Sequence, residues 1–227
     1  MQGEIAPEIL TSSLLDTIPW LKHGFGTRHA ALSQDAMASL RQIHSAISLV
    51  AERGSGCIGE GDALITRTPG VVVSVRTADC FPILIADTGH RVAAAIHAGW
   101  RGTAARIVVE VLRRMTSEFG TDPREVAAAI GPGIGPCCYE VGKEVANQFG
   151  FEMSGRLDLA EQNVKQLIAA GVSRANIDVL AACTFCHPEL FHSWRREGQS
   201  AGRMVSFIEL RWAGISSCPD KQLKRQR

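Results

Sequence analysis

Two consecutive apolar runs in the middle of the chain constrain the fold more than any other feature of the sequence. FPILIAD (81–87) and RVAAAIHA (91–98) have the length and composition of buried strands, and only the short polar turn DTGH (87–90) separates them. A turn this short joins neighbouring antiparallel strands, so we expect a hairpin. Cys80 precedes the first run and His97 lies at the end of the second. The hairpin therefore brings these two side chains to the same edge of a sheet, away from the turn.

Strands and helices are interspersed along the rest of the chain. Residues 107–119 carry apolar side chains at helical spacing, and Gly120 ends that helix. An antiparallel hairpin within such an alternation favours a mixed sheet in an α+β or α/β domain over a regular doubly wound sheet. We expect further strands at 70–75, at 125–136 (running into a loop rich in Gly and Pro), at 177–184 and at 202–210, and further helices at 141–150 and 157–172.

The size and the charge balance of the chain limit its class of function. It has 227 residues and no interrupting linker, which predicts a single domain over 1–227 with a flexible basic tail at 213–227. A net charge of +1 gives no reason to expect nucleic acid or a membrane surface as a partner. The N-terminus lacks the pattern of a signal peptide, and seven cysteines, two of them adjacent, make a poor disulfide framework. We therefore expect a soluble cytoplasmic protein with reduced thiols.

Three residues at the edges of apolar runs are candidates for chemistry: His44, Cys80 and His97. Each alone has a packing explanation, since a buried Cys behaves as a small hydrophobe and a His at a strand end is often a hydrogen-bonded core residue. Because the hairpin pairs Cys80 with His97, two chemistries become possible. Cys80 is a thiolate nucleophile with a histidine as its base, or thiolate and imidazoles bind a metal with His44 as the third ligand. The second arrangement leaves one tetrahedral position open, as in catalytic zinc sites, although copper also accepts these ligands.

Several arginines lie near these residues in the sequence. Arg101 follows His97 after a Gly-Trp turn, Arg41 precedes His44 by three residues, and Arg195 lies in FHSWRREGQSAGR. For any one of these arginines, a solvated surface position is at least as common as a functional role. Several arginines near a metal site would nevertheless suit phosphate, because a guanidinium group binds two phosphate oxygens at once. The segment IGPGIGPCCYEVG (130–142) lacks the lysine of a P-loop and is interpreted as a pocket wall. Its Tyr139 and Glu140 are available to contact a substrate.

Five segments in this order resemble one known family: RQIHSA, GDALITRTPGVVVSVRTADCFPILIAD, AAIHAGWRGTAARIV, AAIGPGIGPCCYEVG and CTFCHPELFHSWRREGQSAGR, over residues 40–210. They are similar to the multicopper polyphenol oxidoreductase, or laccase-like, family, which is also described as the purine nucleoside phosphorylase-like or peptidoglycan-editing-factor family. The TADC and HAGWRG motifs at this spacing are highly specific.

The resemblance implies more than the spacing shows. Family members bind zinc through residues that match His44, Cys80 and His97. Their fold is α+β, a single-domain mixed-sheet sandwich flanked by helices, resembling the cysteine-hydrolase-like fold of deamidase toxins. Their reported activities are phosphorolysis of adenosine, inosine, guanosine and methylthioadenosine, and deamination of adenosine. A small purine nucleoside and phosphate are the implied partners, and zinc rather than copper is the implied metal.

The leading hypothesis is therefore a zinc-dependent purine nucleoside enzyme. Arg101, then Arg41, then Arg195 would hold phosphate, while zinc would lower the pKa of a bound water for deamination. Asp79, next to Cys80, would orient that water or a ligand, or would act as a turn or capping residue.

Three alternatives remain open at this point. A metal-free Cys-His hydrolase or amidase would use Cys80 as nucleophile and His97 as base, which fits the role in editing peptidoglycan precursors that is reported in the family. A binding domain would keep the metal and the nucleoside without turnover. A copper polyphenol oxidase ranks last, because one three-ligand site gives no basis for a multicopper cluster.

The chain departs from the family pattern at one place. Members usually have a serine at the position of Gly26, followed by a glycine-rich segment and a Ser-Leu-Asn-Leu-Gly stretch. Here only 12 residues separate Arg28 from Arg41. Substrate contacts from that segment are therefore in doubt, whereas all three metal ligands are present.

Overall fold

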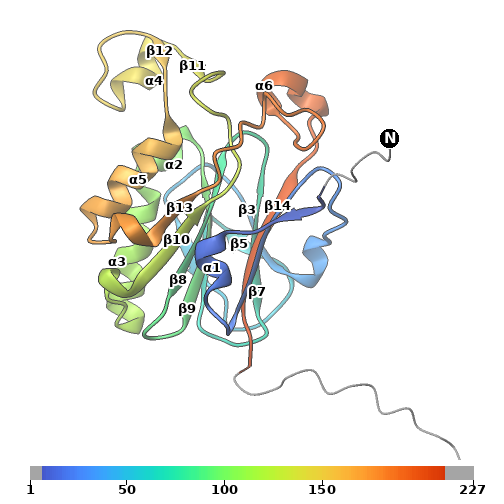
Figure 1. Ribbon diagram of the computed structural model, residues 1–227, viewed down its shortest axis with the longest axis vertical. Coiled ribbons are helices and arrows are strands. Elements are labelled where there is room, and N and C mark those ends of the chain that lie inside the picture. The colour runs from blue at the N-terminus through green and yellow to red at the C-terminus, as the bar shows by residue number, and fades with distance from the viewer. Residues whose placement is uncertain (1–6, 213–227) are drawn as a thin grey trace, which may run out of the picture.

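The computed structural model describes residues 7–212. The tail expected at 213–227 lies outside these residues. Two six-stranded mixed sheets pack face to face, and helices cover the outer face of the second sheet (Figure 1). This is a mixed α+β fold, as expected. The likeness to deamidase toxins stays a prediction, and so does the single-domain organisation.

The first sheet has the strand order β1-β2-β14-β7-β3-β5. Its β14 pairs antiparallel with both β2 and β7, while β3 runs parallel to β7 and β5. The strands are β1 (Ile9–Leu10), β2 (Leu21–Gly26), β14 (Met204–Leu210), β7 (Val72–Thr77), β3 (Ala38–Arg41) and β5 (Gly56–Glu60).

The second sheet has the order β13-β10-β8-β9-β6-β4. Its three central pairs are antiparallel, and the outer strands β13 and β4 run parallel to their neighbours. The strands are β13 (Ile177–Val179), β10 (Val126–Ile130), β8 (Phe81–Asp87), β9 (Val92–Ala98), β6 (Ala63–Thr66) and β4 (Ser48–Val50), and a separate two-stranded sheet pairs β11 (Glu140–Val141) with β12 (Gly155–Arg156).

The predicted hairpin is confirmed as β8–β9. Phe81 lies opposite Ala98, and Pro82 opposite His97. Every residue of both strands is buried, because the second sheet has two covered faces. Ala93 and Ala95 pack in the core between the sheets, whereas Ala94 and Ile96 belong to the core beneath the helices. The two cores explain why these strands are continuously apolar and do not alternate.

The helices lie mostly on one side of the second sheet (Figure 1). Ile107, Val111 and Met115 of α3 are fully buried, and Gly120 ends this helix with a φ of 77°, which a residue with a side chain rarely adopts. The helices are α1 (Ser13–Asp16), α2 (Trp100–Ala104), α3 (Ile107–Phe119), α4 (Lys143–Asn147), α5 (Leu159–Ala169) and α6 (Trp194–Glu197).

Three expected strands differ in extent or position. The one expected at 177–184 ends at Val179, and the one expected at 202–210 begins at Met204. The strand expected within 125–136 ends at Ile130 and runs into a loop, as predicted. The one expected at 70–75 is shifted to Val72–Thr77, pairing along β14. Within residues 7–212, no helix combines the length and the apolar composition required to cross a bilayer.

Candidate active site

His44, Cys80 and His97 come together at the end of the β8–β9 hairpin away from its turn. One ligand atom from each residue lies within 4.8 Å of the other two. Cys80 immediately precedes β8, and His97 lies near the end of β9. His44 comes from the turn between β3 and β4, where its φ of 59° is left-handed. The imidazole rings of His44 and His97 meet edge to face with their centroids 4.9 Å apart.

Asp62 holds two of these ligands in place. Its fully buried carboxylate accepts a hydrogen bond from Nδ1 of His97 at 2.8 Å and from the backbone N–H of His44 at 3.0 Å. It also accepts from the backbone N–H groups of Ile43 and Ser45 and from the Ser45 hydroxyl. Because Nδ1 of His97 is occupied, Nε2 is the nitrogen left for a metal or a thiol. Asp62 was not predicted from the sequence, where its only signal is its place just before the apolar strand β6.

The first glycine of the HAGWRG motif, Gly99, lies against the side chains of Cys80 and His44. A Cβ atom on Gly99 would come within 2.7 Å of Sγ of Cys80 and 3.4 Å of the His44 ring. The backbone at Gly99 is extended, with φ −80° and ψ 175°, so glycine is not required there by conformation. Close approach to the sulfur is the reason for a glycine at this position.

The electrostatics of the site couple its members. Burial raises the pKa of Cys80, but hydrogen bonding to the rings of His44 and His97 outweighs burial and lowers this pKa to about 7. Burial lowers the pKa of His97, but its hydrogen bond to Asp62 prevails and raises that pKa to about 9. Burial also raises the pKa of Asp62, but the hydrogen bonds from His97 and Ser45 outweigh burial and lower this pKa to about 2. At neutral pH the Asp62 carboxylate is therefore ionised, the His97 ring is protonated and the Cys80 thiol is partly ionised.

The donor set fits a transition metal. A thiolate and two imidazoles would supply three ligands to a tetrahedral ion and leave one position open, the pattern of catalytic zinc, and copper accepts the same donors. Asp62 would hold the ring of His97 in the orientation that metal binding needs. At many metal sites a ligating histidine donates its other ring N–H to a carboxylate in the same way.

Asp79 acts on the surrounding loops. Its φ is 81°, and its buried carboxylate accepts hydrogen bonds from the Thr184 and Ser193 hydroxyls at 2.6 and 3.1 Å. It also accepts from the backbone N–H of Arg195 at 2.6 Å. With these three donors, the carboxylate positions the segment that carries Arg195, which corresponds to the capping role considered from the sequence.

A cavity of about 790 Å3 opens over the three ligands. Arginines from separate parts of the chain line it, and each of its three large aromatic rings has a guanidinium over its face: Arg101 over Trp100 at 4.2 Å, Arg195 over Tyr139 at 5.4 Å and Arg203 over Trp194 at 5.4 Å. Arg41 and Arg76 complete the basic lining. Stacking on a ring restrains a guanidinium while leaving its N–H groups free to bind an anion.

Most of the predicted substrate residues line this cavity. Arg41, Arg101, Arg195 and Tyr139 do so, although Arg41 also forms an ion pair with Glu60. Glu140 is not part of the lining. Its backbone carbonyl accepts a hydrogen bond from Nη1 of Arg195 at 3.2 Å, so it acts on the pocket through that arginine.

Five further residues line the cavity but were not predicted from the sequence as substrate contacts: Gln42, Arg76, Trp100, Trp194 and Arg203. Gln42 and Arg76 are joined by two hydrogen bonds between the Gln42 amide and the Arg76 backbone, each 2.8 Å. Among the described residues, Arg41 is the first in sequence order to line the cavity. The shortened stretch between Arg28 and Arg41 therefore forms no part of the cavity wall.

The chain is similar to known proteins over most of its length. The model of the multi-copper polyphenol oxidoreductase laccase family matches residues 25–211. The chain belongs to this family. It is a metal-binding family, and the matched residues include His44, Cys80 and His97, which could hold a metal ion.

Curated relatives carry names of purine nucleoside enzymes. A purine nucleoside phosphorylase of Bacteroides thetaiotaomicron is 45% identical over 161 residues, which are 65% of this chain and 60% of that protein. The adenosine deaminase RL5 of an unknown prokaryotic organism is 39% identical over 65% of this chain and 61% of its own length. The chain thus spans about three fifths of these relatives. The crystal structure of YlmD from Geobacillus stearothermophilus superposes with a TM-score of 0.83, at 26% identity, covering 92% of this chain and 98% of that one.

Proposed function

We propose that this chain is a zinc-dependent purine nucleoside enzyme that cleaves adenosine, inosine, guanosine or methylthioadenosine with phosphate and also deaminates adenosine. The observation that carries the proposal is the cavity over His44, Cys80 and His97, whose walls combine basic and aromatic side chains. The names of the curated relatives support the same class of reaction.

The lining suits the two parts of the substrate. Arg101 and Arg195 offer guanidinium groups to phosphate oxygens, and Arg41 is shared with Glu60. Trp100 and Trp194 offer apolar surfaces against which a purine can pack. Burial, followed by the nearby charge of Cys80, raises the pKa of Tyr139 to about 12. Its phenol therefore stays protonated at neutral pH and can donate a hydrogen bond to the base or ribose.

In phosphorolysis, a phosphate oxygen forms a bond to C1′ of the ribose while the bond from C1′ to the purine nitrogen breaks. The bonding electrons leave with the base, which takes up a proton, and the products are free base and ribose 1-phosphate. The arginines place phosphate beside the sugar and offset its charge in the transition state. In deamination, water replaces the amino group of adenosine and ammonia leaves. A metal at the site would supply Lewis-acid charge for either reaction.

The test is a product assay on the metal-replete enzyme. Inosine should release hypoxanthine only when phosphate is present, and adenosine should give inosine without phosphate. Cys80→Ser should lower both activities at least about 100-fold, because it removes a thiolate ligand. Arg113→Ala serves as the control, since Arg113 is exposed on α3 and pairs with Glu110. Absence of both products from metal-replete protein would refute the proposal.

A second candidate rests on the line Cys80–His97–Asp62. A thiol, an imidazole and a carboxylate in this order form the arrangement of a cysteine hydrolase, here one acting on amides of peptidoglycan precursors. This enzyme would need no metal. Iodoacetamide should abolish its activity and chelators should spare it, whereas the nucleoside enzyme should lose activity to chelators.

A further inference from the structure

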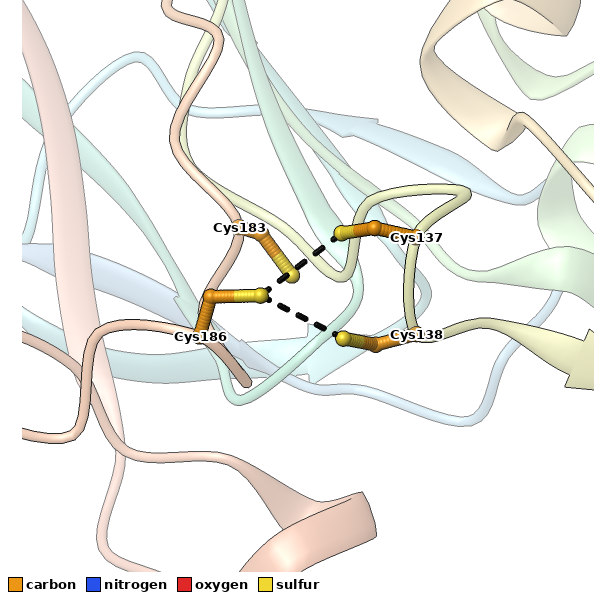
Figure 2. Close-up of side chains that lie close together, drawn as sticks. All are labelled: Cys137, Cys138, Cys183 and Cys186. Carbon is orange, nitrogen blue, oxygen red and sulfur yellow. Dashed lines mark hydrogen bonds between the residues drawn. The ribbon is translucent and has the colours of Figure 1, made fainter.

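Four cysteines outside the candidate active site converge on one point. Cys137 and Cys138 lie in the loop after β10, while Cys183 and Cys186 follow β13. Figure 2 shows the four side chains pointing toward one another from these two segments. Their sulfur atoms all lie within 4.8 Å of one another. Sγ of Cys186 is 3.3 Å from that of Cys138 and 3.6 Å from that of Cys137.

We propose that these four cysteines bind a structural zinc ion that joins the 131–141 loop to the 180–196 segment. Nothing in the proposed nucleoside chemistry requires this second site.

The sulfur spacing favours a single small ion. With zinc–sulfur bonds of about 2.3 Å, the corners of a tetrahedron lie about 3.8 Å apart, which is close to the separations of 3.3 and 3.6 Å around Cys186. A [4Fe–4S] cluster would place each thiolate on a different iron and spread the sulfurs further apart. A closed set of four thiolates with no open position is the pattern of structural rather than catalytic zinc.

The backbone around the cysteines is already shaped for ligation. Gly133 and Cys183 form a parallel β-bridge, and the N–H of Gly135 donates to Sγ of Cys183 at 3.2 Å. Two backbone N–H groups, of Cys138 and Tyr139, donate to the carbonyl of Gly135, which closes the turn that presents the adjacent pair. A donor to sulfur stabilises the charge of a thiolate, so the N–H of Gly135 favours the ligating form of Cys183.

Arg196 fixes the other pair. Its Nη1 donates to the carbonyls of Thr184 and Phe185, both at 2.8 Å, and these two residues separate Cys183 from Cys186. The Cys-x-x-Cys turn is therefore held by a side chain from α6. This spacing lets two thiolates bind one ion from the same turn.

The two joined segments carry walls of the cavity described above. Tyr139 follows the first pair directly, and Thr184, between the second pair, donates to Asp79. Asp79 in turn holds the backbone of Arg195. A zinc ion at the four cysteines would fix Tyr139 and Arg195 relative to each other from outside the pocket. Its binding would release up to four thiol protons, one for each sulfur that becomes a thiolate.

The experiment measures the number of zinc ions and of thiolate ligands in a variant whose candidate active-site metal position has lost its cysteine. Protein carrying Cys80→Ser is purified with zinc, and its zinc content is measured by mass spectrometry. We expect one tightly held zinc per chain, lost in the double variant with Cys186→Ser and retained in the double variant with Cys57→Ser. Cys57 is an exposed cysteine on β5 that belongs to neither cluster. Because Cys186→Ser can also impair folding, Cys186→His provides a variant that keeps four ligands and should retain the ion.

Cobalt substitution gives a second readout. The sulfur-to-cobalt charge-transfer absorption grows with the number of thiolates, so the Cys80→Ser protein should show a four-thiolate spectrum, and the Cys186→His double variant a three-thiolate one. Zinc that stays after Cys186→Ser would overturn the proposal. So would iron with inorganic sulfide, or disulfides that take up two or four of the six thiols left in the Cys80→Ser protein as purified. Failure of the nucleoside assay with this zinc present would leave the site standing and refute only the proposed activity.

Discussion

Asp62 is the residue on which the candidate active site depends most, although it does not face the substrate. One buried carboxylate orients His97 and holds the backbone turn that presents His44. An ion pair in which each buried partner also has hydrogen bonds is costly to break, because the remaining group is left unpaired.

The first prediction concerns Asp62→Asn. The amide has one acceptor oxygen and would turn its NH2 toward groups that also donate, so the His44 turn and His97 lose their common partner. We expect metal affinity at the active site to fall about 10–100-fold and the free energy of unfolding to fall by about 1–3 kcal/mol. Competition with a chromogenic chelator and urea denaturation measure the two effects. Asp122→Asn, at a partly exposed carboxylate paired with Arg124, should leave metal affinity unchanged.

The second prediction uses two glycines with matched backbones. Gly99 and Gly142 both cap short helices with extended conformations, φ −80° and −71°. A Cβ at Gly99 would press on Sγ of Cys80, whereas one at Gly142 meets nothing within 4 Å. Gly99→Ala should therefore lower metal content and catalytic rate at least about 10-fold with an unchanged circular dichroism spectrum. Gly142→Ala should match the wild type. Equal activity in both variants would show that the close approach at Gly99 has no function.

Among the secondary-structure elements, α1 connects the two sheets. Its N-cap Ser12 donates its backbone N–H to Nε2 of His23 on β2 at 2.9 Å, and its hydroxyl to Asp178 on β13 at 2.6 Å. The ring of His23 must be unprotonated at Nε2 to accept this bond. Burial is the main cause that lowers the pKa of His23 below 6.5, against the charges of Asp16 and Asp178 that raise it.

The third prediction follows from that shift. The unfolded chain binds a proton at His23 at a higher pH than the folded chain does, so the stability contributed by the neutral ring is fully present above pH 6.5. It decreases as the pH falls from 6.5 through the lower pKa of the folded state. Urea denaturation between pH 8 and pH 5 should show this decrease. His23→Gln keeps an acceptor for Ser12 and should flatten the profile in that window, and an unflattened profile would assign the decrease to other groups.

The β8–β9 hairpin could be predicted from the sequence, and the pairing of β2, β14 and β7 could not. Residues 81–98 combine two apolar runs with a short turn, so local pattern and tertiary pairing agree. Strand β2 reads LKHGFG, with two polar side chains, Lys22 and His23, two glycines and no clear period. Its pairing with β14, nearly two hundred residues later, is decided by packing rather than by local preference.

The same dependence on pairing between distant strands explains which site residues could be predicted from the sequence. Cys80 and His97 are adjacent through the predicted hairpin, but Asp62 and Arg203 reach the site through pairings between distant strands. The four-cysteine cluster also depends on a distant pairing, the bridge between Gly133 and Cys183. An adjacent pair of cysteines and a Cys-x-x-Cys turn signal metal binding only when something indicates that they meet.

At the scale of the whole molecule, the pocket is basic although the chain is nearly neutral. The net charge is +1, yet Arg41, Arg76, Arg101, Arg195 and Arg203 all line one cavity, and Asp79 is the acidic residue of that lining. Four of these arginines come from β3, β7, α2 and α6, and Arg203 immediately precedes β14, so only the complete fold assembles them. An anion that binds them binds the folded chain and not the unfolded one.

The fourth prediction follows from this linkage. At a phosphate concentration about 100 times its Kd, binding to the folded state alone adds about 2.7 kcal/mol of stability, which raises the Tm of a chain this size by about 5–10 °C. Scanning calorimetry in phosphate against chloride of equal ionic strength measures the shift. Arg101→Ala should reduce it to less than half, because Arg101 is held over Trp100 inside the cavity. Arg113→Ala, on the exposed face of α3, should keep the full shift. An equal shift in chloride would show that general screening, and not the arginine cluster, responds to phosphate, since surface charges are screened by any salt.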